Sequence, residues 1–271
     1  MPPDASRLDS HGEPAGRPRI TALIPTYNEE ENIEKCLASV AWCDEVLVVD
    51  SFSTDRTRDI ASLLGARILT HEYVNSAAQK NWAIPQASCP WVLIVDADER
   101  VTPELREEVT RLLAGGPDAG AYSVPRVNHF MGRRVRHGGW EADRVIRLFR
   151  RDQARYQERE VHAEVETAGP IPRLHSPLLH YTFRSFNQYW PKIQRYSDWG
   201  ASQAFRDGRR AGFGSVLFRP LGRFLKMYFL RLGFLDGTHG LVLCMLAAFS
   251  VYLKYAKLWE MGPRAGEPPR G

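Results

Sequence analysis

The sequence predicts an α/β fold whose central sheet is mostly parallel and has helices on both faces, followed by a helical, basic and apolar C-terminal extension. The first observation is a set of short apolar runs before residue 100, separated from one another by helical patterns. Continuously apolar strands are typical of parallel sheets that are covered on both faces. The second observation is the stretch 206–231, in which cationic and apolar residues interleave, and the charge-free segment 241–253 that follows it. This second observation predicts the helical C-terminal extension.

The individual elements follow from periodicity and turn residues. A short apolar run that Pro25 ends predicts the first strand, and Ile33, Leu37 and Val40 have helical spacing. Gly65 provides a helix stop, and Pro103 stands in the first turn of a helix. The predicted order is strand 19–25, helix 29–40, strand 45–50, helix 54–64, strand 66–70, helix 76–87, strand 91–96 and helix 102–114.

The pattern changes after residue 119. Strands are predicted at 122–124, 145–149 and 161–165, and a helix from 186 to about residue 210. We expect a main domain at 19–185, with halves at 19–118 and 119–185, and a helical region at 186–262. Residues 1–18 are rich in Pro, Gly, Asp, Ser and Arg, and we expect them to be a disordered leader, with a disordered tail at 263–271.

Composition sets the broad class of the protein. The 271 residues are 44% hydrophobic and 25% charged, with a formal net charge of +4, which is ordinary for a globular chain. The four cysteines show no C-x-x-C spacing, so we expect a reducing compartment. The first residues contain no apolar segment of the kind found in signal peptides, so none is expected.

Two carboxylates follow the predicted strand 91–96. Asp96 and Asp98 lie on the same side of the chain if the extended geometry continues beyond the strand, because side chains alternate along a strand. Hard oxygen donors of this kind suit Mg²⁺ or Mn²⁺, which usually bind together with substrate phosphates. The alternative is that strand ends are acidic simply because Asp favours turns.

Polar residues also follow the other strands, at 25–29 and 50–53. Ligands of open parallel sheets bind outside the carboxyl ends of the strands, so all three segments are predicted to meet at one site. No G-x-G-x-x-G and no Walker loop follows the first strand, which argues against a dinucleotide enzyme and a P-loop NTPase.

In this order, IPTYNEE at 24–30, VDSFSTD at 49–55 and DAD at 96–98 resemble the family-2 glycosyltransferases, which have the Rossmann-like GT-A fold. Later segments resemble a narrower branch, the bacterial transferases that add a sugar, typically glucose, to the lipopolysaccharide inner core. These segments are RLFRR at 147–151, VHAE at 161–164, LHY at 179–181 and KYAKLWE at 254–260. The resemblance thus implies transfer of a sugar from a nucleotide-diphosphate donor.

The resemblance implies roles for matching positions. The nucleotide would contact Pro25, Thr26, Tyr27, Glu29, Asp50, Ser53, Lys80, Asp96 and Ala97. Asp50 would accept a hydrogen bond from the base, which suits a uracil-like N–H and favours a UDP-sugar. Lys80 stands where the family has Arg and remains a phosphate partner. Asp96 would face the ribose and the metal, and Asp98 would ligate the metal.

The remaining roles follow from the same resemblance and from what the transfer reaction needs. A base must take the proton of the acceptor hydroxyl. Asp143 is the first candidate, Glu141 the second and Glu164 the third; alternatively, Asp143 caps a turn or pairs with Arg144 or Arg147. His162 is the candidate third metal ligand, or else a structural residue. Arg147 and Arg150 would clamp the diphosphate or form a solvated strand edge. Trp140 would stack on the acceptor sugar or fill a packing gap.

The C-terminal region predicts contact with a membrane. Cations outnumber acids between residues 206 and 231, and the charge-free segment 241–253 is shorter than the roughly 20 residues that span a bilayer. This combination indicates a peripheral anchor on an anionic membrane surface. Alternatively, the apolar helix packs against the sheet. No nucleic-acid-binding motif is present, and the mild net charge does not suit that partner.

The predicted function is therefore an inverting, metal-dependent glycosyltransferase on the cytoplasmic face of the bacterial membrane, with a lipopolysaccharide-core or related glycolipid acceptor. A sugar-phosphate nucleotidyltransferase needs a Gly-rich, Arg-Lys-containing loop after the first strand, and 25–29 is not such a loop. A non-catalytic nucleotide-sugar-binding module is the third possibility. Processive polymerases carry Q-x-x-R-W, but Asp207 replaces the Trp here, which favours addition of a single sugar.

Overall fold

A computed structural model describes residues 18–141, 143–157, 165–183 and 185–262. The predicted leader, apart from Pro18, and the predicted tail lie outside these residues. Most of the predicted strand 161–165 lies outside them as well. The chain forms two compact units. Unit 1 contains the residues up to 125 together with 144–158 and 163–178, and unit 2 contains 126–143, 159–162 and 179–271.

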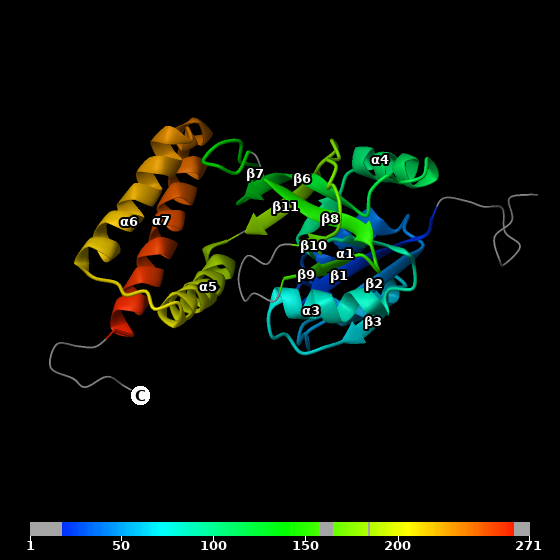
Figure 1. The fold of residues 1–271 in the computed structure, drawn as a ribbon, viewed down its shortest axis with the longest axis horizontal. Helices are drawn as coiled ribbons and strands as arrows, with labels where there is room; N and C mark the ends of the chain where they lie inside the picture. The colour runs from blue at the N-terminus through cyan, green and yellow to red at the C-terminus, as the bar shows by residue number, and fades with distance from the viewer. Residues whose placement is uncertain (1–17, 142, 158–164, 184, 263–271) are drawn as a thin grey trace, which may run out of the picture. The chain divides into compact units, whose positions relative to one another are not determined.

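A parallel half-sheet forms the centre of unit 1 (Figure 1). Its strands are β1 (Ile20–Thr26), β2 (Glu45–Asp50), β3 (Arg67–Thr70) and β4 (Trp91–Ile94), in the order β3-β2-β1-β4. Strand β1 pairs with β2 on one side and with β4 on the other, both in parallel, so the carboxyl ends of β2 and β4 lie at the same edge of the sheet. Strands β1 and β4 are almost fully buried and β2 is buried from Leu47 onward, as their apolar composition predicts, whereas β3 is half-buried or exposed.

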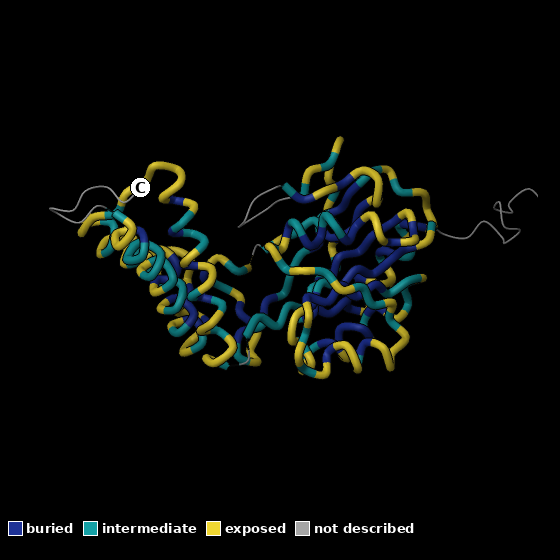
Figure 2. Tube along the Cα trace, turned by 90° about the horizontal axis from the view of Figure 1, so that it is seen from below, coloured by how far each residue is buried: buried dark blue, intermediate teal, exposed yellow. Residues whose placement is uncertain are grey.

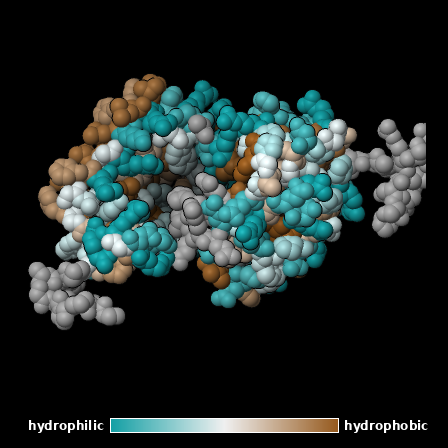
Figure 3. Space-filling view, in the orientation of Figure 1, coloured by the Kyte–Doolittle hydropathy of each residue, from teal (hydrophilic) through white to brown (hydrophobic). Residues whose placement is uncertain are grey.

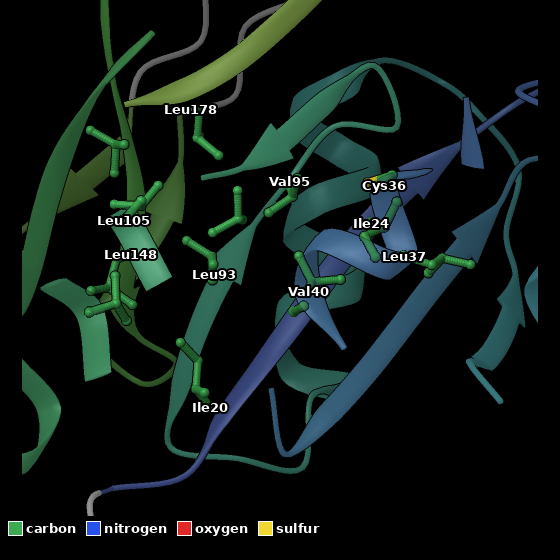
Figure 4. Packing of buried hydrophobic residues seen from close by; sticks show 14 of the residues in the cluster. Ile20, Ile24, Cys36, Leu37, Val40, Leu93, Val95, Leu105, Leu148 and Leu178 are labelled. Atoms are coloured by element: carbon green, nitrogen blue, oxygen red, sulfur yellow. The ribbon is translucent and has the colours of Figure 1, made fainter. Parts of the chain in front are cut away.

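Helices cover both faces of this sheet. The helices of unit 1 are α1 (Ile33–Val40), α2 (Thr57–Leu63), α3 (Ser76–Ala83) with the short η1 (Ile84–Gln86), and α4 (Pro103–Ala114). One apolar cluster joins α1 and α4 to the sheet, and a second joins α3 to it. In Figure 4, Cys36, Leu37 and Val40 of α1 lie among apolar side chains of β1 and β4. The predicted covering of both faces is confirmed.

Helix starts depend on local capping. Asn75 accepts a hydrogen bond from the N–H of Ala78 and caps α3, and Thr102 caps α4 in the same way. Helix α2 starts at Thr57 instead of the predicted residue 54, and α1 starts at Ile33 instead of 29. In both cases the missing turn belongs to loops whose polar groups bond to each other instead of continuing a helix.

The rest of the sheet is mixed. The further strands are β5 (Glu99–Val101), β6 (Ala121–Phe130), β7 (Arg133–Arg134), β8 (Arg144–Arg150), β9 (Ala154–Tyr156), β10 (Val165–Thr167) and β11 (Leu178–Phe183). The order across the large sheet is β3-β2-β1-β4-β8-β6-β11-β5. Strand β8 runs antiparallel to β4 and places Leu148 beside Leu93. Antiparallel β8 therefore brings residues near its start towards the carboxyl end of β4.

The C-terminal region is helical, as predicted. It contains α5 (Phe186–Arg206), α6 (Phe213–Leu225), the π-helical turn η2 (Lys226–Leu230), the short η3 (Gly233–Asp236) and α7 (Gly237–Glu260). The charge-free segment 241–253 is only the middle of α7. The continuous helical stretch Gly233–Glu260 has 28 residues, so by length and composition alone it is able to cross a membrane. The apolar helix is therefore longer than its thirteen charge-free residues predict.

Candidate active site

Two loops are bonded to each other at the carboxyl edge of the sheet. The backbone N–H of Asn28 donates to Ser53 Oγ at 2.9 Å, and the N–H of Thr54 donates to Asn28 Oδ1 at 2.8 Å. The N–H of Glu29 donates to Thr57 Oγ1 at 2.8 Å. Asn28 adopts a left-handed backbone, with φ of 52°, a conformation that Asn tolerates better than most residues. The loops after β1 and β2 therefore form one continuous surface.

Asp50 lies beneath this surface and is fully buried. One carboxylate oxygen accepts from the backbone N–H of Ser53 at 2.9 Å, and the other accepts from its hydroxyl at 2.5 Å. Each oxygen of a carboxylate has more than one acceptor position, so Asp50 keeps capacity for a ligand N–H. The rings of Tyr27 and Phe52 are exposed on the neighbouring loops, and Phe52 has a φ of 59°, which is uncommon for a bulky residue.

Asp96 lies at the centre of an ion-pair network at the end of β4. Lys80 Nζ lies 3.0 Å from Asp96 Oδ1, and Arg147 Nη2 lies 2.5 Å from Asp96 Oδ2. The same Arg147 nitrogen lies 2.7 Å from Glu99 Oε1. The side chains of Lys80, Arg147 and Glu99 are buried, whereas that of Asp96 is 31% exposed. Two cations thus balance two carboxylates, and Asp96 alone is open to solvent.

This network controls the charge of Asp96. Burial by itself would raise its pKa, but the charges of Arg147 and Lys80 outweigh burial and hold the pKa of Asp96 well below its usual range. Burial would likewise lower the pKa of Lys80, yet the carboxylate of Asp96 raises it. Asp96 is therefore an anion, and both cations keep their charge, over the physiological pH range.

Glu99 was missed by the sequence analysis, although it holds the acidic turn together. The backbone N–H of Asp96 donates to Glu99 Oε2 at 3.0 Å, and the N–H of Glu99 donates to the carbonyl of Asp96 at 2.8 Å. This reciprocal pair has the spacing of a capping box, so D-x-x-E at 96–99 was the available signal. Arg100, also missed, donates to the carbonyls of Ala97 and Asn32 at 2.8 and 2.9 Å and ties the turn to the start of α1.

Asp98 is carried by the same turn and is partly buried, next to the buried Ala97. Within the described residues, no group of three or more His, Cys, Asp or Glu side chains is placed to hold a metal ion. Both oxygens of Asp96 already contact a cation, so a metal ion at this carboxylate would compete with Lys80 and Arg147.

The two arginines predicted to clamp the diphosphate have different ion-pair partners. Arg147 is buried between Asp96 and Glu99 and acts as a partner of those carboxylates. Arg150 lies opposite Trp91, at the amino end of β4 and therefore at the opposite end of that strand from Asp96. It is exposed and pairs with Asp152 at 3.5 Å. No local sequence pattern reveals this difference, because the antiparallel pairing of β8 with β4 decides it.

Asp143 and Glu141, two of the three candidate bases, belong to unit 2. Asp143 accepts from Nε and Nη2 of Arg126, each at 2.9 Å, and from Asn128 Nδ2 at 2.9 Å. Burial would raise the pKa of Asp143, but the hydrogen bond and charge of Arg126, with a further hydrogen bond from Asn128, lower it. The ion-pair partner of Asp143 is thus Arg126, and neither Arg144 nor Arg147.

The other predicted residues divide into described and undescribed ones. Glu141 accepts from the backbone N–H of Gly139 at 2.8 Å and lies 3.6 Å from Arg231. Trp140 packs against an apolar cluster of unit 2 that contains Phe130 and Leu243, in agreement with the packing alternative. Glu164 and His162 lie outside the described residues, so their roles stay predictions.

Known proteins resemble this chain over most of its length. It is 31% identical over 248 residues to the lipopolysaccharide core biosynthesis glycosyltransferase LpsC of Rhizobium meliloti (strain 1021), covering 89% of this chain and 92% of that protein. It is 29% identical to the uncharacterized glycosyltransferase RT0209 of Rickettsia typhi (strain ATCC VR-144 / Wilmington), covering 90% and 87% of the two chains.

A crystal structure of glucosyl-3-phosphoglycerate synthase from Mycobacterium tuberculosis, in complex with Mn²⁺, uridine diphosphate and glucosyl-3-phosphoglycerate, is 24% identical. The match covers 44% of this chain and 46% of that one, with a TM-score of 0.35. The sequence model of glycosyl transferase family 2 matches residues 21–173, which include both bonded loops, Lys80 and the acidic turn. The chain therefore belongs to glycosyl transferase family 2 and is a glycosyltransferase.

Proposed function

We propose that this glycosyltransferase moves one hexose, with inversion, from a nucleotide-diphosphate sugar to the core of lipopolysaccharide or a related glycolipid. The observation that carries the proposal is the position of Asp50 and of the turn 96–99 on the two strands that flank β1, at one edge of the sheet. The likeness to LpsC over almost the whole chain supports the lipopolysaccharide core as acceptor.

UDP is the favoured donor nucleotide. Asp50 is buried and holds two hydrogen bonds from Ser53, so its carboxylate is fixed in direction. A fixed carboxylate suits the imide N–H of uracil, which donates a single hydrogen bond. The exposed ring of Tyr27 suits contact with a flat base. Lys80 lies at the turn that would face the phosphates and carries the charge to attract them.

We propose that Mg²⁺ or Mn²⁺ is held by Asp98 together with the donor diphosphate. Mg²⁺ is commonly bound by one or two carboxylates plus substrate phosphates, so the donors of the acidic turn fit without a cage made wholly of protein ligands. The ion would supply positive charge to the leaving diphosphate. Asp96, held by Lys80 and Arg147, would accept a hydrogen bond from the donor ribose. His162 remains a predicted third ligand.

Asp143 is the proposed base, with Glu141 second and Glu164 third. Its lowered pKa keeps Asp143 ionised at neutral pH, which a proton acceptor requires. The same lowering makes it a weak base, so it would take the proton late, after bonding to the sugar carbon has made the acceptor hydroxyl more acidic and as the bond to the leaving diphosphate breaks. Arg126 and Asn128 would hold the carboxylate in one direction.

We also propose that the enzyme works at the anionic, cytoplasmic face of the bacterial inner membrane, where a lipid-borne acceptor is assembled. The basic, apolar C-terminal region supports this location. Family membership favours glycosyl transfer over the sugar-phosphate nucleotidyltransferase and over the non-catalytic binding module.

Two measurements test the proposal. In a thermal-shift screen of UDP, TDP and GDP with and without Mn²⁺, UDP with Mn²⁺ is expected to raise the melting temperature most, because ligands that bind the native state stabilise it. In a transfer assay with radiolabelled nucleotide sugars, label is expected on lipopolysaccharide core that lacks its outer sugars. The proposal would be overturned if no nucleotide raised the melting temperature and no donor gave sugar transfer.

A further inference from the structure

Helix α6 leaves its apolar side chains uncovered. Within the described part of the chain, none of the residues of α6 is buried. Phe213, Leu217, Leu221 and Leu225 are all exposed and follow one another at intervals of four residues, so they share one face of the helix. Phe213 is 79% exposed. An amphipathic helix of this kind normally buries such a face against its own domain.

Helix α7 presents a matching row. Leu241, Met245, Phe249 and Tyr252 are exposed and have the same helical spacing. Helices α6 and α7 pack closely along each other, and we call residues 213–260 the hairpin. Figure 3 shows hydrophobic surface gathered along the hairpin. Exposed apolar surface that continues over two helices marks an interaction site.

The charges around this surface indicate the partner. Exposed cations lie beside and within the hairpin: Arg209, Arg210, Arg219, Arg223, Lys226 and Arg231. In the described stretch 206–262 the exposed acids are Asp207 and Glu260 alone. A second copy of this chain would bring the same cations and be repelled, whereas an anionic bilayer combines an apolar interior with negative headgroups.

The base of the hairpin is bound to a polar helix. Nζ of Lys257, near the end of α7, lies 2.6 Å from Asp198 Oδ1 and donates to Ser197 Oγ at 2.7 Å and Gln194 Oε1 at 3.0 Å. These three partners belong to α5, which also carries Arg195 and Lys192. If α7 crossed a bilayer through its whole length, these charged groups would enter or approach hydrocarbon, which is costly.

The tip of the hairpin is bound to a polar loop. Asp236, at the start of α7, accepts the backbone N–H groups of Arg136 and His137 at 3.0 and 2.8 Å. The N–H of Gly138 donates to the carbonyl of Arg231 at 2.8 Å. Both ends of the hairpin are therefore fastened to polar segments, so neither end is free to pass through a membrane.

We infer that the hairpin lies flat in the headgroup layer of an anionic bilayer, with the rows 213–225 and 241–252 inserted and with α7 not spanning. This inference rests on the proposed function and specifies how the enzyme contacts its membrane. It explains why α7 is long enough to span a bilayer and yet has polar contacts at both ends that prevent spanning.

The first test is sedimentation of the full chain with vesicles of phosphatidylethanolamine and phosphatidylglycerol. Wild type is expected to bind, and less so as salt rises. The variant Leu217→Asp/Leu221→Asp is expected to bind about tenfold or more weakly, because two inserted leucines are replaced by charges. The matched control is Leu63→Asp, which changes an 83% exposed leucine of α2 and is expected to bind as wild type does.

The second test separates a flat hairpin from a spanning helix. Thr238→Cys and Glu260→Cys place thiols near the two ends of α7, at exposed positions. With vesicle-bound protein, a membrane-impermeant maleimide is expected to label both positions from outside, above the labelling of the wild-type cysteines. Labelling of one position alone would show a spanning helix and overturn the inference.

Other outcomes are equally decisive. Equal binding of wild type and Leu217→Asp/Leu221→Asp, or no binding of wild type to anionic vesicles, would overturn the inference. The inference would also be overturned if, without vesicles, the wild type were dimeric and the double variant monomeric, because the apolar face would then join two copies of the chain. None of these measurements uses sugar transfer. A failure of the proposed function is recognised separately, by assaying wild type with detergent-dispersed acceptor.

Discussion

The two units of this protein place their charged and apolar side chains in opposite ways. In unit 1 the apolar residues fill the sheet and the charges of Lys80, Glu99 and Arg147 are buried and paired. In the hairpin of unit 2 the large apolar residues are exposed, and most charges lie at the surface. Figure 2 shows buried residues along the strands of unit 1 and largely exposed or half-buried residues along the C-terminal helices.

The difference agrees with what each unit is proposed to bind. Burying an ion-pair network is costly, and such a network is kept where it fixes the charge and direction of a functional group. Here the group that the network holds is Asp96, for which we propose a role in donor binding. Leaving apolar helix faces exposed is equally costly in water, and such faces are kept where another apolar phase covers them. The comparison predicts that equivalent substitutions have very different effects in the two units.

The largest effect is expected for Asp98→Asn in the acidic turn. If Asp98 binds the metal as proposed, its loss should remove several kcal/mol of transition-state stabilisation, so kcat/KM should fall by about a thousandfold. Radiolabelled transfer measures this, and circular dichroism should show an unchanged fold. Asp152→Asn is the control, since Asp152 is an exposed acid that pairs with Arg150. Full activity of Asp98→Asn would remove the metal role.

The next effect concerns stability. Arg147→Met leaves the buried Glu99 and the partly exposed Asp96 without their shared cation, so the free energy of unfolding should fall by about 3 kcal/mol in urea titrations. Arg150→Met, on the same strand, removes an exposed arginine and should change the free energy of unfolding by less than about 0.5 kcal/mol. Similar losses in the two variants would show that the network is not what stabilises the turn.

The stability of wild type and that of Arg147→Met should depend on pH in different ways. The pKa of Asp96 is lowered in the folded state, so its contribution to stability is complete above the ordinary aspartate pKa and is lost as pH falls towards the lowered value. The gap in stability between wild type and Arg147→Met should therefore be constant near neutrality and narrow below about pH 4. Urea titrations at a series of pH values measure the gap, and a gap that widens in acid contradicts the assignment.

The smallest effect is expected for Lys257→Met in unit 2. Its partner Asp198 is 58% exposed, and ion pairs at the surface contribute little. The free energy of unfolding should fall by about 1 kcal/mol or less. The same variant loosens α7 from α5, so maleimide labelling of Glu260→Cys in its presence also tests whether this contact keeps α7 out of the bilayer. A loss as large as that of Arg147→Met would remove the contrast between the units.

Much of the nucleotide-binding half was predictable from the sequence because its signals are local. Apolar runs, Pro25 and the acids after each strand fix the parallel strands and the edge at which Asp50 and Asp96 lie. The starts of α1 and α2 were misplaced because Asn28 and Thr54 bond to each other across two loops. No local pattern reveals such a bond between residues far apart in the sequence.

By itself, the sequence determined the family, the parallel half-sheet and the acidic turn, because period, turn residues and motif order are properties of short segments. Only the tertiary structure decided that Arg147 supports Asp96 while Arg150 lies at the far end of the same strand, since pairing of β8 with β4 sets which residues face each carboxylate. It also decided that α7, although long enough to span a membrane, is fastened at both ends to polar segments. Such contacts depend on which elements pack together, and the order of residues within one element does not specify that.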